Sequence, residues 1–248
     1  MKLSEIYTQL THGELSQLHI GGGEAGEISA ANSDKVLSHV NMALAALHKR
    51  FLLREERIDV QLMAGRTTYP LHSKYAVMTR QSRELERPLL DTKDNPFLDN
   101  ILKVERVLTD KGYELGLNDE NDPYAIQTPS MSTLRVPVGI VTPTSETPSE
   151  YRTERLQVMY RANHPLLTEE NGADFPEDCE VDLPYSHLEP LLLYIASRVH
   201  NPVGMSENYH AGDSYAMKYE QACQLLEQTN IRVDQMGQVD KNRRGGWV

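Results

Sequence analysis

The 248-residue chain contains little of several features that would define its class directly. It has only two cysteines, Cys179 and Cys223, which lie far apart and show no metal-ligand spacing. We therefore expect free thiols in a reducing compartment rather than a disulfide framework. No apolar run approaches the ~20 residues that a membrane helix requires, and the first residues lack the apolar segment of a signal peptide. The sequence thus predicts no membrane partner and nothing that directs secretion.

Positive charge is also scarce, with 25 lysines and arginines against 36 acidic residues and a formal net charge of −11. Proteins that bind nucleic acid through its phosphates usually carry a basic patch, whereas this chain has only short basic pairs such as Lys49-Arg50. The composition therefore argues against sequence-specific DNA binding. An acidic surface repels DNA, which suits a smooth passage for DNA better than a reader of its sequence.

Catalytic and metal-binding motifs are lacking as well. Gly21, Gly23 and Gly26 match the letters of a dinucleotide fingerprint, but no apolar strand precedes them and the next helix begins some residues later, so a flexible loop is predicted. The nine histidines show no HxH or HExxH spacing, and no serine lies in a Gly-x-Ser-x-Gly elbow. The acidic turn at 118–122 lacks the frame of a calcium loop. We expect no catalytic residue, no metal ligand and no cofactor.

Periodic apolar residues predict a small set of helices. Segment 33–53 carries an apolar residue at every third or fourth position, from Val36 to Phe51, with an acidic first turn and a basic last turn. Two further helices are predicted at 185–200 and 208–229, joined by a turn, and residues 3–10 predict a short helix. The two later helices form a predicted hairpin.

The middle of the chain has the alternating pattern of half-buried strands. Alternation of polar and apolar residues predicts strands at 57–62, 67–71, 101–108, 113–117, 132–136 and 156–161. The turn at 109–112 joins two of them in a predicted β-hairpin. The proline-containing segment 142–150 predicts an exposed loop.

These elements predict an α+β fold in which a helical bundle is interrupted by strands. The bundle consists of the helices near 33–53, 185–200 and 208–229, which bury their apolar faces most economically against one another. The expected division is a helical domain of 1–56 and 184–233, a long inserted β-rich domain of 57–183, and an extended C-terminal arm of 234–248.

Tyrosines gather in the two C-terminal helices, at Tyr194, Tyr215 and Tyr219 among others. Tyr215 and Tyr219 are four residues apart and so share one helix face. Tyrosine fills a core edge or an interface equally well, because its ring is apolar and its hydroxyl stays hydrated. The sequence therefore leaves open whether these side chains contact a neighbouring subunit or the core.

The arm at 234–248 has no apolar period, yet it contains the single tryptophan of the chain, one residue from the end. Tryptophan is a frequent anchor in protein interfaces. We therefore predict that the arm docks onto a partner. The residues expected to carry this contact are Met236, Arg243, Arg244, Trp247 and Val248.

Four segments together carry a resemblance to a known family. They are the run 183–198, which begins Leu183-Pro184-Tyr185, the helix 211–228, the start Met1 to Ile6, and the helix 33–53. In layout and apolar pattern they resemble the head-to-tail adaptor (connector) proteins of short-tailed bacteriophages, over less than half of the chain. The strand block departs from the smallest adaptors, which are nearly all helical.

The resemblance implies a non-enzymatic virion protein of the phage neck, made in the bacterial cytoplasm. It implies a homo-oligomeric ring, typically of twelve copies, beneath the portal protein, with the arm docked on the portal and double-stranded DNA passing through without sequence-specific contact. The strand block would meet the tail tube or nozzle. Two alternatives stay open: a tail tube or nozzle subunit, and a hydrolytic enzyme with a pocket among His164, Asp174 and Glu180.

Overall fold

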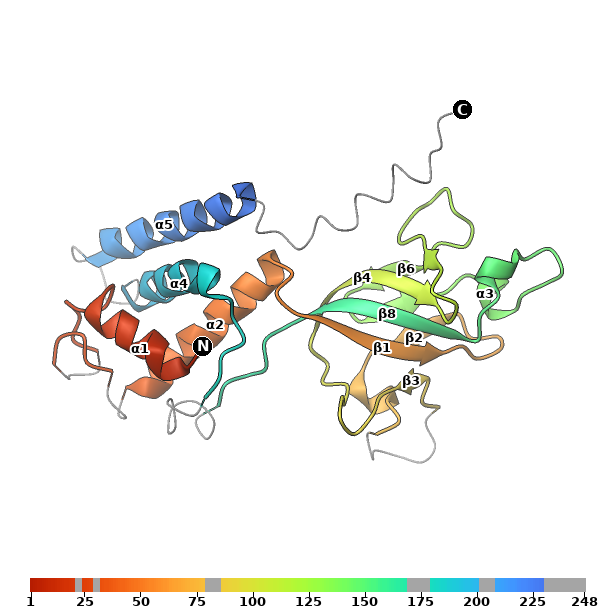
Figure 1. Cartoon of the computed structure of the whole chain (residues 1–248), viewed down its shortest axis with the longest axis horizontal. Coiled ribbons are helices and arrows are strands. Elements are labelled where there is room, and N and C mark those ends of the chain that lie inside the picture. Colours follow the sequence, from red (N-terminus) through yellow and green to blue (C-terminus); the bar gives the residue numbers. More distant parts are fainter. Residues whose placement is uncertain (21–23, 29–31, 79–85, 169–178, 201–207, 230–248) are drawn as a thin grey trace. The chain divides into compact units, whose positions relative to one another are not determined.

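The computed structural model divides the chain into two compact units (Figure 1). The structure describes residues 1–20, 24–28, 32–78, 86–168, 179–200 and 208–229. Residues 1–53 and 164–248 form the helical unit, and residues 54–163 form the strand unit, which interrupts it. These boundaries differ from the expected ones at 57 and 183, because residues 164–183 group with the helices.

The helical unit is built from four α-helices and one short 3₁₀ helix among the described residues. They are α1 (Leu3–His12), α2 (Ser33–Arg50), η4 (Tyr185–His187), α4 (Leu188–His200) and α5 (Asn208–Gln228). Helix α4 packs against α5, α2 and α1. In the part of the chain that the structure describes, none of the helices combines the length and the apolar character needed to cross a membrane.

Helix α2 buries the stripe that its sequence predicts. Val36, Val40 and Leu44 are each at most 1% exposed, and the helix ends where Phe51 turns to an extended backbone. The buried side chains of α2 meet those of α1 and α4 in one apolar cluster. The predicted helix at 33–53 is thus confirmed over residues 33–50.

Extended segments supply much of the remaining core of the helical unit. The main chains of Met1 and Val181 exchange two hydrogen bonds, of 3.0 and 2.8 Å, and the N–H of Leu3 donates to the carbonyl of Cys179 at 3.0 Å. This pairing places the side chains of Cys179, Val181 and Leu183 in the cluster that the helices share. The N-terminus is therefore joined by main-chain hydrogen bonds to the segment that leads into α4.

The predicted fold class, a helical bundle with an inserted β-rich domain, is wrong. The described chain is a mixed α and β protein with two antiparallel sheets, and its helices are few and short. A bundle requires long helices whose stripes bury one another. Here α1 has 10 residues and α4 has 13, and coil residues such as Leu15 and Leu167 fill space that a bundle would fill with helix.

The strand unit contains two antiparallel sheets. The larger has the order β3 (Leu89–Leu90), β1 (Glu55–Gln61), β8 (Arg155–Ala162), β4 (Ile101–Thr109) and β5 (Glu114–Leu115). The smaller has the order β2 (Thr68–Pro70), β7 (Thr133–Arg135) and β6 (Gln127–Ser130). The short elements η1 (Ser73–Tyr75), α3 (Val138–Val141) and η2 (Ser149–Tyr151) lie between strands.

The first and last long strands of the unit pair with each other. Ile58 lies opposite Val158 and Val60 opposite Leu156, and all four side chains are at most 3% exposed. Alternation in both strands points these residues to the same face, where they join a second apolar cluster with Tyr69 of the smaller sheet. The predicted β-hairpin is confirmed as β4 and β5.

Candidate functional site

The three tyrosines singled out in the sequence lie on the inner side of the α4–α5 hairpin. The rings of Tyr194 and Tyr219 meet edge to face, with centroids 5.2 Å apart. All three side chains are partly buried and pack against the core of the helical unit. Burial, together with the nearby Cys223, raises the pKa of Tyr219 far above its ordinary value. These side chains therefore hold α5 to its own unit.

Tyr215 fastens the beginning of α5 to the turn after α1. Its ring stacks on His200 with centroids 4.9 Å apart, and His200 is the last residue of α4. The Tyr215 hydroxyl donates to the carbonyl oxygen of Glu14 at 3.4 Å, and His200 Nε2 lies 3.1 Å from the same oxygen. One carbonyl thus joins three segments of the helical unit.

Arg50, at the end of α2, fixes the other half of α5. Its Nη1 lies 2.7 Å from Glu220 Oε2, and its Nε lies 3.0 Å from Glu227 Oε1. The hydrogen bond from Arg50 lowers the pKa of Glu220 below its ordinary value. The two carboxylates lie seven residues apart and hence on the same helix face, so one guanidinium grips two turns of α5.

The opposite face of α5 is open to solvent and exposes two large apolar side chains among uncharged polar ones. We define the outer stripe as Met217, Gln221, Leu225 and Gln228, which follow one another at helical spacing and include no charged residue. Met217 is 65% exposed and Leu225 is 59% exposed. Met217 and Leu225 lie about two helical turns apart on this face, so a partner surface laid along α5 would cover both side chains.

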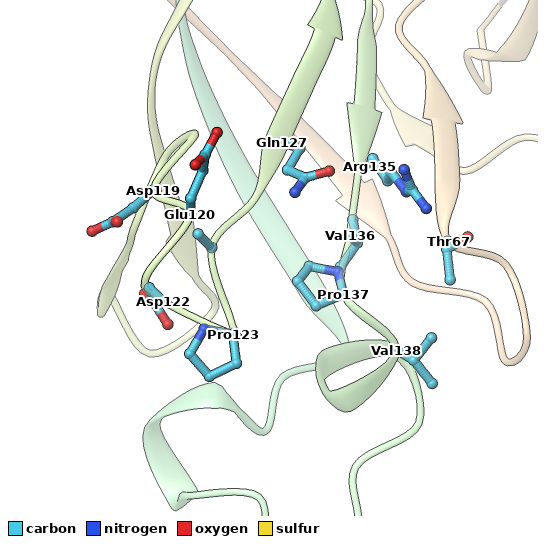
Figure 2. Close-up of a pocket in the computed structure, with 11 residues that line it drawn as sticks. Thr67, Asp119, Glu120, Asp122, Pro123, Gln127, Arg135, Val136, Pro137 and Val138 are labelled. Atoms are coloured by element: carbon cyan, nitrogen blue, oxygen red, sulfur yellow. The ribbon is translucent and has the colours of Figure 1, made fainter.

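The strand unit contains an open pocket of about 380 Å³ (Figure 2). One wall is the acidic turn with Asp119, Glu120 and Asp122, and the other is the end of β7 leading into α3, with Arg135. Gln127 of β6, directly opposite Arg135 in the sheet, lies between them. The remaining lining residues are Thr67, Pro123, Ala125, Val136, Pro137 and Val138.

Two of the three pocket carboxylates accept hydrogen bonds from main-chain N–H groups of their own turn. Asp119 Oδ1 accepts the N–H of Asn121 at 2.9 Å, and Asp122 Oδ1 accepts the N–H of Tyr124 at 2.9 Å. Within the described chain no group of three metal-ligating side chains comes together. The pocket brings acidic and basic groups together, which suits a polar contact, and its lining residues include no cysteine, serine or histidine.

The residues proposed for a hydrolytic site do not converge among the described residues. The N–H of Asp182 donates to His164 Nε2 at 3.1 Å, and His164 Nδ1 lies 2.7 Å from the carbonyl oxygen of Pro165. Both ring nitrogens of His164 are therefore hydrogen-bonded to main-chain groups. Glu180 is exposed, and its main chain forms an isolated antiparallel β-bridge with that of Lys2, whereas Asp174 lies outside the described residues. His164 and Glu180 also belong to the helical unit and not to the strand unit.

The predicted docking arm lies outside the described residues. This applies to Met236, Arg243, Arg244, Trp247 and Val248, and also to Gly21 and Gly23 of the glycine-rich loop. Gly26 is described, and its φ of 78° is a backbone conformation that favours glycine.

Sequence reasoning missed the outer stripe and the pocket. The stripe was detectable, because Met217 and Leu225 are eight residues apart and lie away from the tyrosine face of the same helix. The pocket was not detectable, because it depends on the pairing of Gln127 with Arg135 and on the fold of the 118–124 turn over β6.

The chain matches no protein-family profile, and it matches no curated protein. The likeness to head-to-tail adaptors therefore rests on the residues and layout given in the sequence analysis.

Proposed function

We propose that the chain is a structural virion protein whose copies form a ring between the portal and the tail of a short-tailed phage. The observation that carries this proposal is the outer stripe of α5, which exposes Met217 and Leu225 on a helix that is fixed on its other face. The role requires no catalytic group, and we propose that the protein is not an enzyme.

An exposed apolar side chain on a fixed helix favours association, because little conformational entropy is lost when a partner covers it. Tyr215, Tyr219 and the two pairs of Arg50 already hold α5 in place. Covering apolar surface stabilises a complex by about 25 cal/mol per Å² before the costs of association. Met217 and Leu225 are the side chains that would gain most from a neighbouring copy, and a head-to-tail contact repeated around an axis closes a ring.

The charge of the chain supports the passage of DNA without binding it. With a formal net charge of −11, the ring would repel the phosphates of double-stranded DNA and so offer little sequence-independent adhesion.

In this proposal the two partners of the ring meet different parts of the chain. The arm at 234–248 docks onto the portal through Met236, Arg243, Arg244, Trp247 and Val248. The strand unit meets the tail tube or nozzle, and its exposed apolar side chains supply a surface for that contact. These are Leu98 at 60% and Val138 at 66% exposed.

A tail tube or nozzle subunit is the alternative that a structural observation favours. The strand unit holds a five-stranded and a three-stranded antiparallel sheet, and tail tubes are usually dominated by β-structure. This alternative expects contact with the tail proteins alone, whereas a neck ring must also bind the portal.

Sedimentation velocity of the purified chain tests the ring, with and without portal rings. The wild type is expected to form a large, discrete species, and the double variant Met217→Glu and Leu225→Glu is expected to remain a monomer. Met131→Glu, an equally exposed methionine in the strand unit, is the matched control and should assemble as the wild type does. A wild type that stays monomeric under both conditions, or a double variant that assembles normally, would overturn the proposal.

A further inference from the structure

Three buried histidines lie where both connections to the strand unit enter the helical unit. His48 is in the last turn of α2, just before the chain leaves for the strand unit, and it is fully buried. His164 is the first residue of the helical unit on the return, and His187 ends η4; they are 8% and 2% exposed. The rings of His48 and His164 meet edge to face with centroids 5.6 Å apart.

His187 is placed where only a neutral ring fits well. Its ring meets Phe51 edge to face, with centroids 4.8 Å apart, and its Nδ1 lies 3.1 Å from the hydroxyl of Ser186. Its Nε2 is buried and has no hydrogen-bond partner among the described residues. Burial lowers the pKa of His187 below its ordinary value. A protonated ring would therefore carry its positive charge in a buried place where the Nε2 N–H has no acceptor among the described residues.

His164 is held in one neutral tautomer by the backbone. The N–H of Asp182 donates to Nε2, so this nitrogen carries no proton, and Nδ1 donates to the carbonyl oxygen of Pro165. Protonation would place an N–H opposite the N–H of Asp182. The hydrogen bond that ties the return segment to the segment before α4 would then be lost.

The charged groups on the elements around these rings offer limited compensation. Arg50 of α2 lies over the Phe51 ring at 6.0 Å and is paired with Glu220 and Glu227. Asp182 on the return segment and Glu189 in the first turn of α4 are exposed. Burial is the single cause that shifts the pKa of His187.

We propose that His48, His164 and His187, the histidine latch, form a pH-sensitive device that anchors both connections at neutral pH and releases them in mild acid. The latch goes beyond the proposed virion role and does not depend on it. It concerns the helical unit of any assembly in which the chain takes part.

The direction of the effect follows from proton binding. The closed latch binds fewer protons than the open one, so its stability is complete above the unfolded pKa of about 6.5 and is lost as pH falls below it. Each histidine that must stay neutral changes the opening equilibrium by at most about tenfold per pH unit below that value.

Hydrogen exchange of the full chain, corrected for the intrinsic dependence of exchange on pH, tests the latch at pH 7.5 and pH 5.5. Peptides covering 43–53 and 183–196 are expected to open at least fivefold more often at the lower pH in the wild type. In His187→Phe this increase should shrink. His72→Phe, which replaces an exposed histidine of the strand unit, should behave as the wild type. An unchanged opening equilibrium in the wild type, or the same increase in His187→Phe, would overturn the proposal.

A nuclear magnetic resonance titration of the wild-type histidines keeps the test decisive if His187→Phe does not fold. The ring of His187 is expected to titrate below the free-histidine value of about 6.5. Titration at or above that value would overturn the latch.

Discussion

The side chain of Asn41 satisfies both main-chain groups of Leu167, a residue 126 positions away. Its Nδ2 donates to the Leu167 carbonyl oxygen at 2.8 Å, and its Oδ1 accepts the Leu167 N–H at 3.0 Å. The carboxamide thus imitates a neighbouring strand and fixes the return segment on α2. Leu167 is thereby held in the core, where it is 6% exposed.

Asn41→Ala should destabilise the helical unit by about 1–3 kcal/mol, because it leaves a partly buried N–H and carbonyl without partners. Urea unfolding measured by circular dichroism gives the change in free energy. Ser38→Ala replaces an exposed polar residue of the same helix and should change stability by no more than about 0.5 kcal/mol. Equal effects of the two substitutions would show that the hydrogen bonds of Asn41 with Leu167 contribute nothing to stability.

Arg50→Lys should loosen α5, although it keeps the positive charge. A single ammonium cannot reproduce the geometry in which Nη1 meets Glu220 and Nε meets Glu227. We expect a loss of about 1 kcal/mol at low salt, falling as salt is added, since Glu220 is half exposed. Hydrogen exchange in peptides of α5 reports this change. Hydrogen-exchange protection of α5 equal to that of the wild type at low salt would show that the ion pairs of Arg50 with Glu220 and Glu227 do not hold the helix.

Gly139→Ala should destabilise the strand unit, against the direction that helix propensity predicts. Gly139 lies in α3, where alanine would by itself add about 0.5–1 kcal/mol of stability. A Cβ at this position would lie 3.0 Å from Tyr124 Cε1, and Tyr124 is stacked on Tyr151 with centroids 4.3 Å apart. Overpacking of this kind costs about 1–3 kcal/mol.

The double variant Gly139→Ala with Tyr124→Leu identifies the cause, because it removes the ring that the new methyl group meets. In that background the alanine should lose its penalty and become neutral or stabilising in thermal unfolding. A penalty that persists without the Tyr124 ring would assign the effect to the backbone of α3.

Tyr160→Phe should destabilise the strand unit most at neutral pH. The Tyr160 hydroxyl donates to Glu56 Oε2 at 2.8 Å, and Asn100 donates to the same oxygen at 3.0 Å. Burial alone would raise the pKa of Glu56, but the hydrogen bonds from Asn100 and Tyr160 and the charge of Arg54 outweigh it, so this pKa lies below its ordinary value.

The sign of the pH dependence follows from that depressed pKa. The stabilising contribution of Glu56 is complete above the unfolded pKa of about 4.3 and is lost as pH falls through the lower folded pKa. The loss of stability in Tyr160→Phe should therefore be about 1–3 kcal/mol at pH 7 and should shrink towards pH 3. Tyr151→Phe, which removes a hydroxyl that is hydrogen-bonded to Tyr113 and not to a carboxylate, should show a smaller change with pH over this range.

The sequence predicted local elements well and tertiary arrangement poorly. The stripe from Val36 to Leu47 requires only the helical period, and the turn before Tyr113 requires only neighbouring residues. The pairing of β1 with β8 joins residues about a hundred positions apart, such as Ile58 and Val158, and no local pattern specifies it. The helical bundle was wrong for the same reason, because periodicity could not show that segments around Leu167 and Val181 would occupy the core.

For the candidate site too, the sequence showed the local pattern but not the tertiary arrangement. Tyr194, Tyr215 and Tyr219 were visible as a cluster in sequence, but their placement between α4 and α5 needed the geometry of His200 and Glu14. The histidine latch was invisible because its three residues come from three segments.

Electron microscopy of the chain mixed with purified portal rings tests the central claim most directly. The account predicts an added ring of density on the portal, present with the wild type and absent with the variant Met217→Glu and Leu225→Glu. Portal particles that remain bare in the presence of excess wild-type chain, with that chain still monomeric in the same sample, would contradict it.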